Sequence, residues 1–354
     1  MQRRTQAGHR PGPESTGGVG EAEIRLAGAQ ERQKMLELGA SVWAFCALAG
    51  ALEGGLLDEL ATPQTPAQIS ERTGASAALI EAVLGVLAAL GLVHVAGEAF
   101  VCTPGMSAYT SGWRKEVVCA DMRATQLLAA EVVDRFRSDD ASAHGWRYAD
   151  PALLQAWGVR STEPVGVWAE RLFPALEGLP EALAAPTARF LDVGTGVGRL
   201  AIAMCHQFPT LRVVGLDPYE TALELARLNV AEAGLASRIE LRPQPVQGLA
   251  DEGCYDLAWV PVMFLPADVA ARGLRRVRAA LRPGGWAVLG SLAAEGGGLQ
   301  PAVQRLMSLL FGSGRLLPDH AAQMLRAARY ESIRILPVTP GVPIRMIIAR
   351  RPTN

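Results

Sequence analysis

Apolar and polar positions alternate in a regular order through the carboxyl-terminal half of the chain. Short apolar runs bounded by glycine, proline or acidic residues are separated by segments whose apolar residues recur at helical spacing. The expected strands are the apolar start of 189–200, then 212–217, 239–242, 255–262 and 282–290, and the expected helices are 220–234 and 266–281. This alternation predicts an α/β fold with a Rossmann-like, doubly wound parallel sheet, closed by an antiparallel hairpin of 333–338 and 344–350.

A different pattern occupies the amino-terminal third. Thr65 and Pro66 can cap and start a short helix that ends at Gly74, and Ser76 can cap a longer one that stops at Gly91. Two short apolar runs follow, at 92–95 and 100–102, with turn residues between them. Helix, turn, helix and hairpin together predict a winged helix within an otherwise helical domain.

Charge argues against DNA as the partner of this domain. The chain has 34 basic and 35 acidic residues, a net charge of -1, so it lacks the excess of Lys and Arg on which polyanion affinity depends. The helix expected to read DNA, 75–90, carries Glu81 as its only charged residue, which phosphates would repel. We therefore expect no nucleic-acid partner. The apolar surfaces of this helix and of Leu38–Leu52 instead predict a homodimer.

Cysteine usage and the amino-terminal sequence indicate a cytoplasmic protein. The five cysteines are odd in number and none forms a CxxC pair, so neither a disulfide framework nor a metal site is expected. Residues 1–20 lack the apolar core of a secretory signal, and we expect a disordered tail over 1–22. The 15 uncharged residues of Leu38–Leu52 span about 22 Å as a helix, short of the roughly 30 Å of a bilayer core. We expect no membrane partner.

The middle of the chain is helical and rich in aromatic residues. The organisation we expect is a winged-helix dimerisation domain over 23–110, a helical adapter over 111–186 and a cofactor-binding catalytic domain over 187–354. The adapter contains Trp146, Tyr148, Trp157 and Trp168. Such clustering predicts either an apolar pocket for a flat ligand or packing between domains.

The clearest candidate for a ligand-binding motif is the glycine-rich segment RFLDVGTGVGRL, residues 189–200. Gly194, Gly196 and Gly198 follow the first strand, and such a turn lets a ligand approach the backbone closely. A dinucleotide fingerprint requires glycine at 199, where this chain has Arg199. Asp192 can bind an ammonium group, which S-adenosylmethionine has and NAD lacks. Asp217 follows 19 residues after Gly198 at the end of the second strand, the place of a ribose-binding carboxylate.

With these motifs, the later YDLAW and LRPGGW make the chain resemble class I S-adenosylmethionine-dependent methyltransferases. Together with the winged helix and adapter, it resembles the small-molecule O-methyltransferase family, whose members dimerise. The resemblance implies S-adenosyl-L-methionine as cofactor and a site at its methionine end made of Asp192, Val193, Gly194, Thr195, Gly196 and Gly198. It assigns the ribose to Asp217, the adenine to Pro218 with Gln244, Gln247 or the backbone of Val246, and the border of the sulfonium to Val260 and Pro261.

One departure from the family concerns the catalytic base. These enzymes place a histidine just after the fourth strand, but here Met263 is nearest that position, and a thioether is no base at neutral pH. The alternative bases are His144, Tyr148, Glu170 and Asp268, unless the acceptor atom needs none. The expected acceptor pocket contains Met263, Phe264, Met307 and Phe311 with the adapter's Trp146, Tyr148, Trp157 and Trp168.

The predicted function is methyl transfer to the carbon, nitrogen or oxygen of an apolar, aromatic small molecule of secondary metabolism. Two alternatives stay open. One is a fold relative that binds S-adenosylmethionine but catalyses a cyclisation or rearrangement, and the other is a ligand-responsive regulator.

Overall fold

The computed structural model describes residues 21–137, 148–292, 296–314, 316–337 and 344–353. The chain divides into two compact units, 1–107 and 108–354. The second unit contains both the expected adapter and the expected catalytic domain. The predicted tail stays a prediction, since residues 1–20 lie outside the described ranges, and the first helix begins at Glu21.

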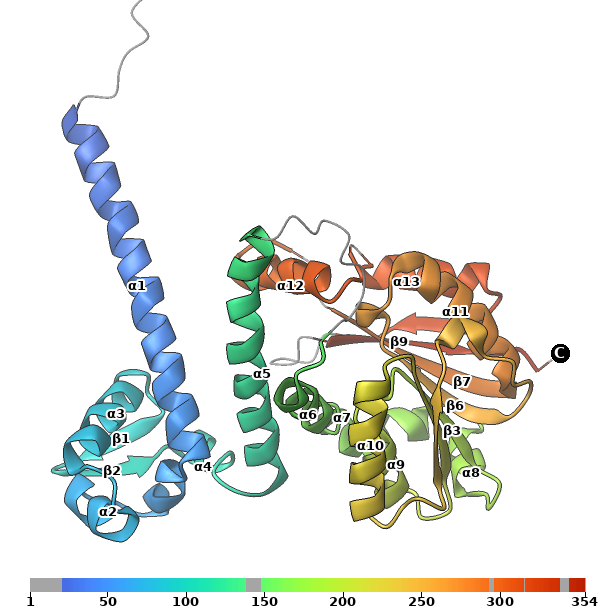
Figure 1. Cartoon of the computed structure of the whole chain (residues 1–354), viewed down its shortest axis with the longest axis horizontal. Coiled ribbons are helices and arrows are strands. Elements are labelled where there is room, and N and C mark those ends of the chain that lie inside the picture. Colours follow the sequence, from blue (N-terminus) through green and yellow to red (C-terminus); the bar gives the residue numbers. More distant parts are fainter. Residues whose placement is uncertain (1–20, 138–147, 293–295, 315, 338–343, 354) are drawn as a thin grey trace, which may run out of the picture. The chain divides into compact units, whose positions relative to one another are not determined.

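The first unit has the elements expected of its sequence (Figure 1). They are α1 (Glu21–Glu53), a 3-10 helix (Leu56–Ala61), α2 (Pro66–Thr73), α3 (Ala77–Ala89), β1 (Val93–Ala96), β2 (Ala99–Cys102) and α4 (Pro104–Ser107). Thr65 starts α2 as predicted: its hydroxyl accepts the Gln68 N–H at 3.2 Å, and the Gln68 side chain accepts the Thr65 N–H at 2.8 Å. Ser76 stands at the start of α3 but makes no capping hydrogen bond.

Helix α1 is longer than the apolar run suggested. By length and composition alone, its Gly28–Glu53 part could cross a membrane, and 17% of the most apolar stretch is buried. Length alone therefore does not exclude a membrane-spanning α1, because the helix continues on the amino-terminal side of Leu38–Leu52. Its exposed large apolar residues are Met35, Leu36, Leu38, Val42 and Trp43.

The second unit is built on a seven-stranded sheet in the order β5-β4-β3-β6-β7-β9-β8. Its strands are β3 (Arg189–Val193), β4 (Arg212–Asp217), β5 (Ile239–Pro243), β6 (Tyr255–Val260), β7 (Leu281–Leu292), β8 (Glu331–Ile335) and β9 (Ile344–Arg350). Strands β3 to β7 run parallel, and β9 pairs antiparallel with β7 and β8. The predicted doubly wound sheet and its closing hairpin are confirmed.

The helices of the second unit are α5 (Gly112–Arg137), α6 (Pro151–Arg160), α7 (Glu163–Val167), α8 (Leu179–Ala184), α9 (Arg199–Gln207), α10 (Glu220–Glu232), α11 (Ala267–Ala280), α12 (Leu299–Leu310) and α13 (Pro318–Ala327). Of these, α8, α9 and α10 pack on one face of the sheet and α11 and α13 on the other, while α6 packs on α5 and α9 (Figure 1). Between α7 and α8 the chain forms a π-helical turn, Trp168–Leu172, and a 3-10 turn, Phe173–Ala175. Further 3-10 turns at Val246–Gly248 and Val262–Phe264 follow β5 and β6.

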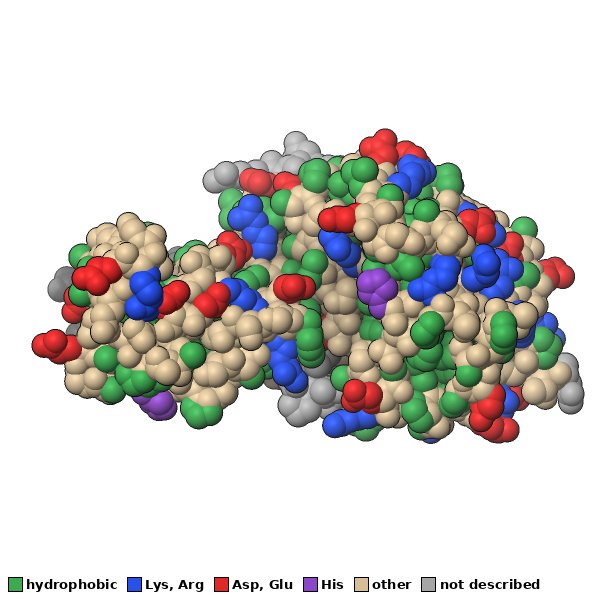
Figure 2. Space-filling view, turned by 90° about the horizontal axis from the view of Figure 1, so that it is seen from below, with side chains coloured by type: hydrophobic (Ala, Val, Ile, Leu, Met, Phe, Trp, Pro, Cys, Tyr) green, Lys and Arg blue, Asp and Glu red, His purple; other side chains and the backbone are tan. Residues whose placement is uncertain are grey.

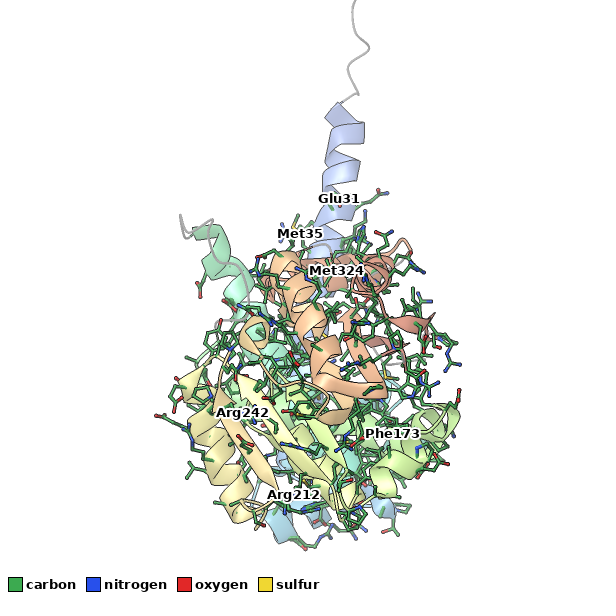
Figure 3. The ribbon with its side chains drawn as sticks, turned by 90° about the vertical axis from the view of Figure 1, so that its right-hand side faces the viewer. Glu31, Met35, Phe173, Arg212, Arg242 and Met324 are labelled. Atoms are coloured by element: carbon green, nitrogen blue, oxygen red, sulfur yellow. The ribbon has the colours of Figure 1, made fainter. Side chains whose placement is uncertain are left out.

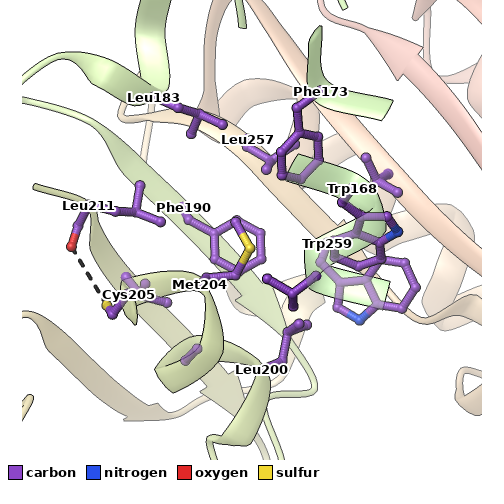
Figure 4. Close-up of a cluster of buried hydrophobic side chains, with 14 of the residues drawn as sticks. Trp168, Phe173, Leu183, Phe190, Leu200, Met204, Cys205, Leu211, Leu257 and Trp259 are labelled. Carbon is purple, nitrogen blue, oxygen red and sulfur yellow. Dashed lines mark hydrogen bonds between the residues drawn. The ribbon is translucent and has the colours of Figure 1, made fainter. Parts of the chain in front are cut away.

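The strands divide their apolar residues between two cores, as the period of two in a strand requires. Phe190 faces the α8 and α9 side, while the adjacent Leu191 faces α11 and α13. Figure 4 shows the first core, in which Phe190 of β3 and Leu257 and Trp259 of β6 meet Leu183, Met204, Phe173 and Trp168. Both faces are thus buried along the central strands, which explains their nearly continuous apolar runs.

Ion pairs hold the middle and the edge of the sheet. Strand β7 contains the whole predicted segment 282–290, and its Arg282 is held 2.6 Å from the buried Asp256. At the edge, Arg242 of β5, labelled in Figure 3, pairs with Glu240 at 2.7 Å and with Asp251 at 2.8 Å. Charged side chains on an edge strand oppose pairing with another chain.

Candidate functional site

The glycine loop lies between β3 and α9, at the carboxyl ends of the parallel strands. Gly194, Gly196 and Gly198 all have positive φ, at 65°, 55° and 75°. Residues with a Cβ rarely adopt this conformation, which explains the glycine at each of the three positions. The Thr195 N–H donates to the Leu216 carbonyl at 2.9 Å and ties the loop to β4. In the sheet, β4 lies on one side of β3 and β6 on the other, so the strand order changes direction at β3. The loop after β3 therefore stands at the switch point where such sheets bind ligands.

Two buried carboxylates border this loop. Asp192 is 1% exposed and accepts a hydrogen bond from the Thr195 hydroxyl at 2.7 Å. Burial raises the pKa of Asp192 from 3.8 to about 7, the Thr195 hydrogen bond opposes the rise, and the charge of Asp217 adds to it. Asp217 accepts the N–H groups of Gly196 and Tyr219, each at 2.9 Å. Burial raises the pKa of Asp217 as well, and these two hydrogen bonds oppose the rise.

Among the described residues, neither carboxylate has an ion-pair partner. The two buried acids lie beside three glycines, whose lack of a Cβ lets a ligand approach the backbone. Such a site suits a ligand with a cationic group and hydroxyl donors. The ammonium group and the ribose of S-adenosylmethionine supply both kinds of group. The donor set therefore fits this cofactor.

A cavity of about 480 Å³ adjoins the loop. Ten of the residues expected to bind the cofactor line it: Asp192, Val193, Gly194, Thr195, Gly196, Asp217, Pro218, Gln244, Val246 and Pro261, and Gln247 lines it as well. The cavity volume falls in the range of small-molecule sites. Gly198 and Val260 are not in its lining: a Cβ on Gly198 would stand 3.4 Å from Ala226 of α10, and Val260 is fully buried in the core.

Aromatic side chains also line the cavity. Trp157, Trp168, Met263 and Phe264 line it, together with Trp259 and Met346. The Trp157 ring meets Phe264 at 5.6 Å and Phe311 at 5.3 Å, both edge-on. Phe311, Met307 and Tyr148 belong to the same apolar cluster but do not line the cavity. Trp146 and His144 lie outside the described residues.

Two of the expected bases are outside the lining of this cavity. Glu170 is exposed, and Asp268 on α11 is exposed and paired with Arg272 at 2.7 Å. Sequence reasoning missed three polar residues that do line the cavity: Arg160, Ser161 and Glu163.

Gly158 is the sequence signal that could have located these residues. It stands inside α6, where glycine is otherwise unfavourable. A Cβ at Gly158 would lie 2.2 Å from the Val197 side chain, so α6 packs directly on the glycine loop. The residues that follow on α6 and α7 are therefore brought to the cavity.

Comparison with known proteins identifies the family. Residues 190–285 match the family model described as a methyltransferase domain. The chain is 32% identical over 226 residues to the release factor glutamine methyltransferase of Cereibacter sphaeroides, an alignment that covers 57% of this chain and 78% of that protein.

The chain is a class I S-adenosylmethionine-dependent methyltransferase. It is also 31% identical over 163 residues to the ubiquinone biosynthesis O-methyltransferase of Bordetella avium, covering 45% of this methyltransferase and 62% of that one. The cofactor predicted from the glycine loop is confirmed.

Solved structures resemble the methyltransferase over nearly its whole length. The mitomycin 7-O-methyltransferase MmcR is 22% identical with a TM-score of 0.63, covering 92% of this chain and 99% of that chain. CalO1, a methyltransferase of calicheamicin biosynthesis with S-adenosylhomocysteine bound, is 17% identical with a TM-score of 0.62, covering 91% and 98%. At these identities the likeness establishes the fold, and it extends through the helical region that precedes the sheet.

Proposed function

We propose that this methyltransferase transfers the methyl group of S-adenosylmethionine to a flat, apolar aromatic small molecule of secondary metabolism. One observation carries the proposal: a single cavity joins the glycine loop and its two acids to a wall of Trp157, Trp168 and Phe264. A pocket that is mainly apolar, with several aromatic side chains in its lining, favours a planar apolar ligand. The names of MmcR and CalO1 place these fold relatives in natural product biosynthesis, which supports the same class of substrate.

The chain's own residues have distinct proposed roles at the cofactor. Asp192 faces the ammonium group, and the backbone of Gly194 to Gly196 admits the methionine end. Asp217 accepts the ribose hydroxyls, with Pro218, Gln244 and Val246 beside the adenine. The cofactor supplies a methyl group already activated by a positive sulfur. The protein contributes mainly by aligning the acceptor and excluding water, since an in-line displacement depends strongly on position.

The experiment is transfer of labelled methyl from S-adenosylmethionine to a panel of aromatic hydroxyls, amines and carbon nucleophiles. We expect label in at least one aromatic class. Trp157→Ala should lower turnover and leave S-adenosylhomocysteine binding unchanged. Trp113→Ala is the matched control, because Trp113 on α5 is 54% exposed and outside the cavity lining. If the enzyme binds the cofactor but labels no class of acceptor, the alternative is favoured, in which the chain binds S-adenosylmethionine and catalyses a cyclisation or rearrangement.

We further propose that the enzyme is a homodimer that uses the exposed apolar side of α1. Trp43 is 79% exposed and Leu38 is 61% exposed, a large cost for an isolated helix in water. Sedimentation should give a dimer for the wild type and a monomer for Trp43→Glu. Monomeric wild-type protein that partitions into lipid vesicles would instead assign this side of α1 to a membrane.

We propose a cytoplasmic location because the cysteines form no disulfide bonds in the described part of the chain. They are Cys46, Cys102, Cys119, Cys205 and Cys254. Cysteines without disulfide bonds are typical of a reducing compartment.

A further inference from the structure

The cavity contains a carboxylate that the cofactor does not require. Among the described lining residues the carboxyl groups are Asp192, Asp217 and Glu163. The first two stand at the glycine loop and accept hydrogen bonds from the protein. Glu163, the first residue of α7, has no hydrogen-bond or ion-pair partner in the described part of the chain.

The neighbouring cation is engaged elsewhere. Arg160 pairs with Asp121 of α5 at 2.9 Å, and its guanidinium lies 4.7 Å from the centre of the Trp157 ring. The Arg160 side chain is only 12% exposed, so these two contacts hold it in place. Arg160 therefore fixes the Trp157 face of the cavity and leaves the Glu163 carboxylate available to a ligand.

The surroundings of Glu163 make it a better base than a carboxylate in water. Glu163 is open to solvent on one side, yet partial burial raises its pKa. The charge of Arg160 opposes this rise, and that of Asp121 adds to it. A raised pKa brings a carboxylate closer to the operating pH at which a general base is most effective. In the place where the family has histidine, the buried Met263 offers no such group.

We propose that Glu163 is the general base of this methyltransferase and that its acceptor is an aromatic hydroxyl. The inference rests on the proposed function and deepens it. The hydroxyl oxygen attacks the methyl carbon, a C–O bond forms as the S–CH₃ bond breaks, and that electron pair stays on sulfur. The hydroxyl proton passes to the Glu163 carboxylate. The products are the aryl methyl ether, S-adenosylhomocysteine and a neutral Glu163, and no further reactant is needed.

The test compares Glu163→Gln with Glu170→Gln, a control of the same chemistry outside the cavity. The acceptors are compared at pH 8, where 2-naphthol is largely un-ionised and 4-nitrophenol is largely ionised. Loss of a general base costs about 10²- to 10⁴-fold in rate. Glu163→Gln should therefore lower kcat for 2-naphthol about 100-fold or more and change kcat for 4-nitrophenol much less. Glu170→Gln should resemble the wild type with both.

A second readout does not depend on turnover. With S-adenosylhomocysteine saturating, 4-nitrophenol is titrated in its absorbance band. A carboxylate that accepts the phenol hydrogen favours the neutral phenol, so the wild type should raise the apparent pKa of the bound probe. Glu163→Gln should remove that shift, and Glu170→Gln should retain it.

Several outcomes would overturn the assignment of Glu163. One is an equal loss of kcat for both phenols. Another is an apparent pKa of bound 4-nitrophenol that is not raised, or that is raised equally in Glu163→Gln. A third is the transfer of label to no hydroxyl in the panel. Weaker S-adenosylhomocysteine binding by Glu163→Gln at unchanged kcat would assign the residue to the cofactor instead. If the wild type fails to bind S-adenosylhomocysteine at all, the proposed function itself is wrong.

Discussion

Asp192 should make the stability of the free enzyme fall as pH rises. Its pKa is raised from 3.8 to about 7 in the folded protein. Because the folded value exceeds the unfolded one, the group contributes most stability below pH 4 and loses it as pH rises to about 7. A rise of about three units, at about 1.36 kcal/mol each, corresponds to about 4 kcal/mol in the free energy of unfolding.

Asp192→Asn removes the ionisation and keeps an acceptor for the Thr195 hydroxyl. Urea denaturation of both proteins from pH 5 to pH 8, without cofactor, measures the effect. Between pH 5 and pH 8 the variant should gain about 2–3 kcal/mol of stability relative to the wild type, because the rest of the loss occurs below pH 5. Asp268→Asn, which removes an exposed carboxylate paired with Arg272, controls for the loss of one negative charge. Parallel pH profiles for Asp192→Asn and the wild type would refute the argument that burial of this carboxylate is costly.

Two further substitutions test packing and capping. Gly290→Ala places a Cβ 2.5 Å from the Trp259 ring and 3.2 Å from the Met263 sulfur, so we expect a loss of about 1–3 kcal/mol in urea denaturation; an unchanged midpoint would mean that the cavity wall yields freely. Thr65→Ala removes the side-chain half of the capping box with Gln68 and should cost about 1 kcal/mol, while Thr65→Ser should restore it. Equal stability of the two Thr65 variants would contradict the role of the hydroxyl.

The parts of the site that follow local rules could be predicted from the sequence. Positive φ at Gly194 and the carboxylate of Asp217 at a strand end are consequences of a strand, a turn and a helix over a short stretch. The helix start at Thr65 depends on residues only three apart. At Gly194 and Thr65 the determining geometry is local, and Asp217 follows from the regular spacing of a strand about 20 residues after the glycine loop.

The acceptor side could not be predicted in this way. Glu163 reaches the cavity because Gly158 packs on Val197, 39 residues along the chain. Glu170, only seven residues after Glu163, faces solvent because a π-helical turn changes the helical phase between them. Spacing along one segment carries no information about such contacts.

Charge is mixed on the surface, as the sequence predicts. Acidic and basic side chains are interspersed on the face seen in Figure 2, in keeping with the net charge of -1.

Calorimetric titration with S-adenosylhomocysteine tests the central claim, that the glycine loop and Asp217 form the cofactor site. Hydrogen bonds to a charged group contribute about 1.5–3 kcal/mol each, so Asp217→Ala should weaken binding about tenfold or more. Asp251→Ala, which removes a carboxylate of the β5 edge, should bind as the wild type does. A wild type that fails to bind, or an Asp217→Ala variant of native fold that binds equally well, would contradict the account.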